Sequence, residues 1–187
     1  LLYHNIELPK VSLDDILHNS MPLVNEVMSK CRPLEFFPDY IKQGYYPFGT
    51  EGFALYHQRV ENIVDMLLNI ELPQLRSVDI GNIRKIKALL AIISTEVPML
   101  VDITKLATLT GIARTTILAY LQYLHEAKLI RLLYSDDLSV KKMQKPDKIL
   151  MENTNLLQAL SLQVPNIGTM RETFFCNQLG YTHQVEY

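Results

Sequence analysis

Seven residues with side chains suited to nucleic-acid contacts lie in one stretch, between residues 114 and 145. Lysine and arginine bind phosphates, and threonine and tyrosine hydroxyls hydrogen-bond to phosphates or base edges. The candidates are Arg114, Thr115, Thr116, Tyr120, Lys141, Lys142 and Lys145. The first four are expected on a helix that enters a major groove, and the three lysines on a wing that holds the DNA backbone. A DNA-binding module is therefore one interpretation of this pattern.

The same stretch is also consistent with a module that packs against a neighbouring protein domain. Its second helix carries only Arg114 as a cation before Lys128, and Glu126 opposes that charge. Ala113 stands where a Ser or Asp helix cap is expected. Because a fold does not by itself define a function, both interpretations stay open.

No catalytic or metal-binding pattern accompanies this stretch. Gly44 and Gly49 have the spacing of a phosphate-binding loop, but Thr50 and Glu51 follow where a lysine and a Ser or Thr are needed. The five histidines are scattered without a partner at ligand spacing. We therefore predict no catalytic residue and no metal site in this chain.

Adjacent carboxylates and the two cysteines are expected to be structural. Asp14 and Asp15 are neighbours, so on a helix they point apart, and Ser12 with Asp15 forms a capping box. Cys31 and Cys176 are far apart and lack a C-x-x-C partner. The pattern predicts reduced core thiols in a cytoplasmic protein.

The elements that must position the candidate residues run from Asp102 to Tyr134. Apolar residues at helical period lie on both sides of Gly111, where a left-handed backbone fits. A strand-like run over residues 129–134 follows, and a second one resumes in residues 141–151 after a polar loop. A helix, a tight turn, a helix and two strands predict a winged helix.

The remaining sequence predicts further helices. The main ones are a helix over residues 51–70 ended by Pro73, and a second one from the Asp79 cap to Ser94. A helix over residues 166–179 closes the pattern before a terminal strand. Its inward side chains are expected to be Met170, Phe174, Phe175 and Leu179.

Composition allows one domain or two small ones, since the chain has 187 residues and a net charge of −2. Residues 102–148 hold 8 Lys and Arg against 5 Asp and Glu, so the predicted winged helix is the positive part. The longest apolar run, residues 88–93, is too short to cross a bilayer, so no membrane partner is expected. The start at Leu1 suggests a piece of a longer protein.

Three segments together resemble the AAA+ superfamily of ATP-binding proteins that carry a C-terminal DUF4143 domain. They are ARTTILAYLQYLHEAKLI, then KPDKILMENTNLLQALS, then NIGTMRETFFCNQL. The resemblance covers almost the whole chain and implies a mainly α protein. It implies a helical lid-type subdomain over residues 1–97 and a winged helix over 98–152. Residues 153–187 would be a linker helix and the opening helix and strand of a truncated α/β endonuclease-like DUF4143 domain.

The resemblance also implies a role for a few residues. Gly44, Tyr45 and Pro47 would lie near a nucleotide, although the same loop could be a structural turn. Glu172 matches the first acidic residue of the endonuclease-like site, but it cannot hold magnesium alone. It could equally be a surface carboxylate that pairs with Arg171.

By the same resemblance, the parent protein would be an ATPase that uses ATP and magnesium, and its missing N-terminal ATPase domain would be a partner. This chain would be inactive alone, because it has no P-loop, and would relay nucleotide state to DNA or a protein. Two alternatives stay open, a DNA-binding winged-helix module and a protein-interaction module without a nucleic-acid role. A large exposed apolar patch on the winged helix would indicate the latter.

Overall fold

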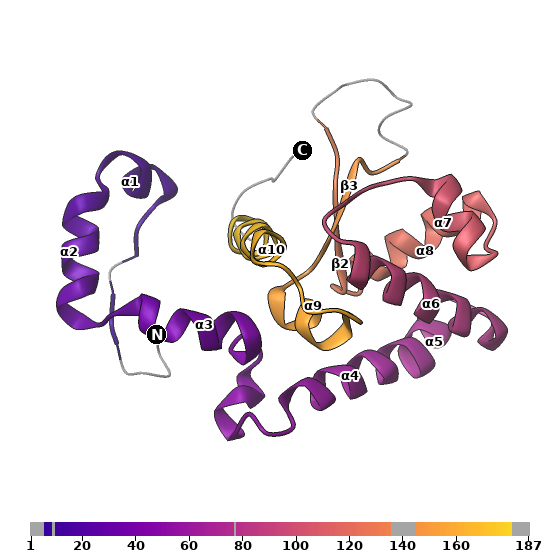
Figure 1. Cartoon of the computed structure of the whole chain (residues 1–187), viewed down its shortest axis with the longest axis horizontal. Coiled ribbons are helices and arrows are strands. Elements are labelled where there is room, and N and C mark those ends of the chain that lie inside the picture. Colours follow the sequence, from indigo (N-terminus) through magenta and orange to yellow (C-terminus); the bar gives the residue numbers. More distant parts are fainter. Residues whose placement is uncertain (1–5, 9, 77, 136–144, 181–187) are drawn as a thin grey trace. The chain divides into compact units, whose positions relative to one another are not determined.

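The structure, a computed structural model, describes residues 6–8, 10–76, 78–135 and 145–180. The chain divides into two compact units, residues 1–53 and residues 54–187. The boundaries predicted after residues 97 and 152 stay predictions. Mainly helical elements and one small antiparallel sheet make up the described part, which confirms the coarse fold class (Figure 1).

The first unit holds three helices, α1 (Leu13–His18), α2 (Ser20–Lys30) and α3 (Pro33–Gln43), and a 3-10 turn, η2 (Pro47–Glu51). None of the three α-helices buries a residue within the described structure. These three helices are amphipathic in sequence, but among the described residues they form no buried core of their own.

In the second unit, α4 (Tyr56–Met66), a π-helical turn η3 (Leu67–Glu71) and α5 (Leu72–Arg76) run on without a break. The predicted helix over residues 51–70 therefore starts later and continues past Pro73. Proline lacks an N–H, and the wider turn comes directly before it, with the Leu72 N–H bonded to the Leu67 carbonyl.

The next elements are α6 (Ile80–Glu96), β1 (Met99–Leu100), α7 (Ile103–Thr110), α8 (Arg114–Glu126), β2 (Ile130–Leu133) and β3 (Lys148–Met151). The strands form an antiparallel sheet in the order β1-β3-β2, so β3 lies in the middle. The sequence pattern predicted β2 and β3, but it missed β1, which contributes only two residues.

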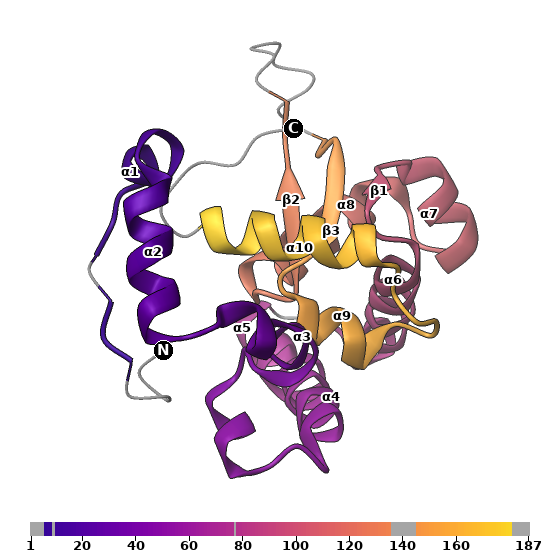
Figure 2. The ribbon, with the colours of Figure 1, turned by 60° about the vertical axis from the view of Figure 1, so that its left-hand side comes forward.

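Side chains on neighbouring strand positions face opposite sides of this sheet. Ile130 and Ile149 are fully buried on the side of α6 and α8, which pack on β3 and β2. On the other side, Leu133 and Leu150 pack against Cys176 of α10 (Ile167–Leu179). The sheet is thus covered on both faces, with α10 lying across β2 and β3 (Figure 2).

The inward face of α10 differs from the expected one. Its buried side chains are Thr169, Met170, Thr173, Cys176 and Asn177, whereas Phe175 is 60% exposed. The expectation for Phe175 is wrong because the sheet face below α10 carries charged as well as apolar side chains. Buried charges need hydrogen-bond partners, so polar residues of α10 face the sheet there.

The helix α9 (Thr154–Leu160) joins β3 to the loop before α10 and packs on α4. The buried hydroxyl of Tyr56 donates a hydrogen bond to Asn155 and ties these two helices together. Among the residues that the structure describes, no helix combines the length and the apolar character needed to cross a membrane. The terminal strand predicted beyond residue 180 lies outside the described residues.

Candidate nucleic-acid interface

The candidate interface is built on the pair of helices α7 and α8. Asp102 caps α7 by accepting hydrogen bonds from the N–H groups of Thr104 at 2.9 Å and Lys105 at 3.0 Å. Gly111 ends α7 in the left-handed conformation, with φ of 65°. This is the turn that the sequence pattern predicted, and it lets α8 begin only three residues later.

The first turn of α8 is open to solvent. Arg114 and Thr115 are exposed, and Thr116 is half-buried. The cap residue Ala113 makes no side-chain hydrogen bond, so the first N–H groups of α8 have no side-chain cap. Behind them, Ile117 is fully buried and fixes the helix on the core.

Lys145, three residues before β3 begins, is exposed as well. The backbone N–H of Lys105 lowers the pKa of Asp102 most, and the positive charges of Lys145 and Arg114 lower it further. Both cations therefore act on the same carboxylate at the start of α7. Lys141 and Lys142, the other predicted wing contacts, lie outside the described residues.

The second half of α8 is held by α5. Arg76 forms an ion pair with Glu126, and its guanidinium carbon lies 5.4 Å from the centre of the Tyr123 ring. Gln122 donates a further hydrogen bond to Glu126 at 3.0 Å. The ion pair offsets the negative charge at the end of α8, where Gln122 and Glu126 are exposed.

A shallow hollow of about 440 Å³ runs along the flank of α8, between this helix and the corner that joins α5 to α6. Its lining includes Thr115, Thr116 and Tyr120 from α8, and Arg76, Asp79 and Asn82 from the corner. Tyr120, a predicted DNA contact, is only 5% exposed and lies in this hollow. The structure therefore places Tyr120 in the wall of the hollow, which it shares with Thr115 and Thr116 of the first turn.

A buried polar cluster under α10 was missed by the sequence analysis. Glu152, Asn153, Thr154 and Asn155 are at most 3% exposed although all four are polar. Asn153 caps α9 through the N–H groups of Asn155 and Leu156. Four polar residues in a row between a strand and a helix were the available signal, since a polar run that is buried needs hydrogen-bond partners for most of its groups.

The structure also describes the residues that were carried over from the family resemblance. Gly44, Tyr45 and Pro47 follow α3 in a loop of aromatic contacts, with the Tyr45 and Tyr46 rings 5.1 Å apart. Glu172 forms an ion pair with Lys148 of β3. It therefore braces α10 against the sheet, and it does not pair with Arg171 in the described structure.

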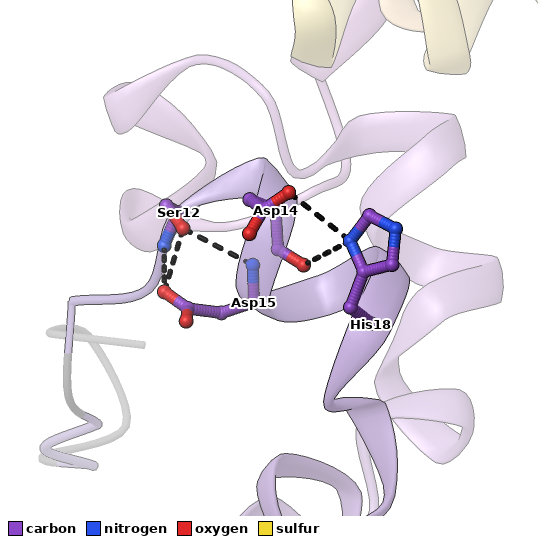
Figure 3. Close-up of polar contacts among 4 residues, drawn as sticks. All are labelled: Ser12, Asp14, Asp15 and His18. Carbon is purple, nitrogen blue, oxygen red and sulfur yellow. Dashed lines mark hydrogen bonds and ion pairs between the residues drawn. The ribbon is translucent and has the colours of Figure 1, made fainter.

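The acidic residues at the start of the chain form a helix cap. The N–H and hydroxyl of Ser12 donate to Asp15, whose own N–H donates back to Ser12 (Figure 3). His18 lies 3.0 Å from the Asp14 carboxylate on the exposed side of α1. This predicted capping box is confirmed, and all of its contacts stay within one helix turn. Over the described residues, no cluster of His, Cys, Asp and Glu could hold a metal ion.

Comparison with known proteins corrects the expected family. A family model described as "Domain of unknown function (DUF8612)" matches residues 34–166. No curated protein and no solved structure matches the chain. The assignment to AAA+ proteins with a DUF4143 domain is therefore wrong. The segments behind it are short patterns of caps and apolar period, which unrelated proteins share. The implied ATP, magnesium and ATPase partner lose their basis with it.

Proposed function

The chain belongs to this family of unknown function, and we propose that its α6–β3 region is a winged-helix module that binds duplex DNA. The order α6, β1, α7, α8, β2 and β3 supports the proposal, as does the position of β3 between the other two strands. In such a module the helix after the tight turn enters the major groove.

The observation that carries the proposal is the open, uncapped first turn of α8 next to two cations. Arg114 and Thr115 are exposed there, and Lys145 reaches the same side, since it acts on Asp102 together with Arg114. Exposed N–H groups at a helix start and nearby cations both favour phosphate oxygens. The net positive charge of residues 102–148 adds a sequence-independent attraction.

The test is fluorescence anisotropy with a labelled mixed-sequence duplex at about 50 mM and about 200 mM salt. We expect the affinity to fall steeply with salt. Arg114→Ala and Lys145→Ala should each weaken binding. Each should also reduce the salt slope, which is the slope of log affinity against log salt concentration, by about 1. The matched control is Arg171→Ala, which removes an exposed arginine from α10, on the opposite side of the sheet.

Absence of binding at the lower salt, with the protein folded, would rule this function out. An Arg171→Ala variant that loses as much affinity as Arg114→Ala would show binding by overall charge and no defined interface. The double variant Lys141→Ala/Lys142→Ala extends the test to the lysines predicted from the sequence.

A protein-interaction role is the second candidate, and one observation favours it. Ile63, Met66 and Ile70 lie three and four residues apart on α4 and η3, and they are 45%, 48% and 52% exposed. This spacing makes one apolar stripe. Within the described α6–β3 region, the exposed large apolar side chains are only Leu100 and Leu109. A variant with Ile63→Ser and Ile70→Ser should leave DNA binding unchanged if the two functions are separate.

A further inference from the structure

Tyr120 stands out because its ring is buried, while its hydroxyl makes no hydrogen bond to a described protein group and is not among the fully buried polar atoms. Only 5% of the residue is exposed, and it borders the hollow along α8. The hydroxyl of a tyrosine whose ring is buried commonly points to a polar partner or to solvent, and here the hollow is the space that it can reach. Burial, followed by the nearby Tyr123 and Asp79, raises the pKa of Tyr120, so the hydroxyl keeps its proton and can donate.

Three neighbouring side chains of the same hollow are also neutral hydrogen-bonding groups. They are the amide of Asn82 and the hydroxyls of Thr115 and Thr116. In the residues covered by the structure, none of these side chains bonds to another protein group. Four neutral groups with a donor hydrogen thus face one small space.

The two charged groups in the lining of the hollow each have a protein partner, although Asp79 keeps its negative charge. Arg76 is paired with Glu126, and the Asp79 carboxylate accepts the Gly81 N–H at 2.7 Å as the cap of α6. The hollow therefore offers donors without a free cation. Asn, Thr and Tyr side chains with these properties commonly bind the phosphate oxygens of DNA.

Thr115 connects the hollow with the proposed DNA-binding surface, because it belongs to the exposed first turn of α8 and also lines the hollow. A DNA strand that passes this turn brings its backbone next to the hollow. We propose that the hollow holds one phosphate group of the DNA backbone, bound by the Tyr120 hydroxyl, the Asn82 amide and the threonine hydroxyls. This inference rests on the proposed DNA-binding function.

The test uses the same duplex and the variants Tyr120→Phe and Asn82→Ala. Each removes one neutral hydrogen bond, so affinity should fall roughly two- to tenfold. The salt slope should stay unchanged, because no cation is lost and no counterion release changes. Thermal unfolding should stay unchanged for Tyr120→Phe, since its hydroxyl has no partner within the described residues.

Asp79→Asn provides a variant with the opposite expected effect. Asparagine caps a helix as well as aspartate does, so α6 should keep its start. The substitution removes a negative charge beside the bound phosphate, and affinity should rise by roughly two- to fivefold at low salt.

The outcomes separate this inference from the function on which it rests. If Arg114→Ala weakens binding but Tyr120→Phe and Asn82→Ala do not, DNA is bound and the hollow holds no phosphate. If Asp79→Asn weakens binding while the protein stays folded, the hollow prefers a cationic group and the inference is wrong. If the intact protein does not bind the duplex, the proposed function and this inference both fail.

Discussion

Arg131 of β2 and Glu152 at the end of β3 form an ion pair beneath α10, with 2.6 Å between Arg131 Nη2 and a carboxylate oxygen of Glu152. Their side chains are 11% and 2% exposed. Asn177 of α10 donates a hydrogen bond to the backbone carbonyl of Glu152 at 2.9 Å. The other carboxylate oxygen of Glu152 and Arg131 Nε have no partner among the described residues. The pair thus joins two strands and a helix, although part of its hydrogen-bonding capacity is unused.

Removing one member of this pair should destabilise the protein strongly. Glu152→Ala leaves the guanidinium of Arg131 buried without its partner, which typically costs about 3–5 kcal/mol. Urea unfolding measures the change. The double variant Arg131→Met/Glu152→Leu is the control, and it should recover most of the loss because two apolar side chains replace the two charges. A loss below about 1 kcal/mol for Glu152→Ala would show that solvent reaches the site.

The turn between α7 and α8 should depend on the missing side chain of Gly111. With φ of 65°, this residue has a conformation that costs an ordinary L-residue roughly 1–2 kcal/mol. Space does not matter here, since an added Cβ would meet no atom within 4 Å. Gly111→Ala should therefore lower the free energy of unfolding by about 1 kcal/mol. Gly111→Asn should cost less, because asparagine tolerates this conformation better. Equal losses for the two variants would contradict this explanation.

The cap of α7 should make stability depend on pH in the acid range. Hydrogen bonds from Lys105 and Thr104, and the nearby cations, lower the pKa of Asp102 below its usual 3.8. The stabilisation is therefore complete above that value and is lost as the pH falls through the lowered pKa. Asp102→Asn keeps a capping side chain without the charge. Urea unfolding at pH about 6 and about 3 should show the difference between the two proteins shrinking at the lower pH. A constant difference would exclude this role of the charge.

The two cysteines should react at different rates. Cys176 is 6% exposed, and burial, followed by the nearby Glu172 charge, raises the pKa of its thiol. Cys31 is half-buried. Because the thiolate is the reactive form, iodoacetamide at pH about 8 should label Cys31 first and Cys176 only in denaturant. Mass spectrometry of the peptides measures both sites. Rapid labelling of Cys176 in the native protein would mean that α10 leaves the sheet readily.

Local signals account for the parts that the sequence predicted. Gly111 defines the turn, Asp79 caps α6, and Ser12 with Asp15 starts α1, because each acts within a few residues of the chain. The exposed first turn of α8 follows from the same period that buries Ile117. These signals predicted the elements. Of the five DNA-contact candidates that the structure describes, four are exposed or half-buried, and Tyr120 is buried.

Long-range packing accounts for the parts that were missed. The strand β1 has two residues, and its pairing with β3 joins Met99 to Ile149, fifty residues later. The polar face of α10 is explained only by the charges of Arg131 and Glu152 on the sheet below it. Tyr120 is a different case, because it lies three residues after Ile117 on the buried face of α8, and this period alone indicated its burial. The wrong family assignment rested on local patterns of the sequence alone.

The position of α10 has a practical consequence for protein production. A fragment designed to end before Asn166 would retain the three strands that the structure describes and all three helices of the proposed winged-helix module. It would nevertheless uncover Leu133, Leu150 and the Arg131–Glu152 pair, which α10 covers in the intact fold. A bare sheet face of this kind promotes association between molecules. Soluble expression and crystallisation trials should therefore use fragments that extend through Gly180.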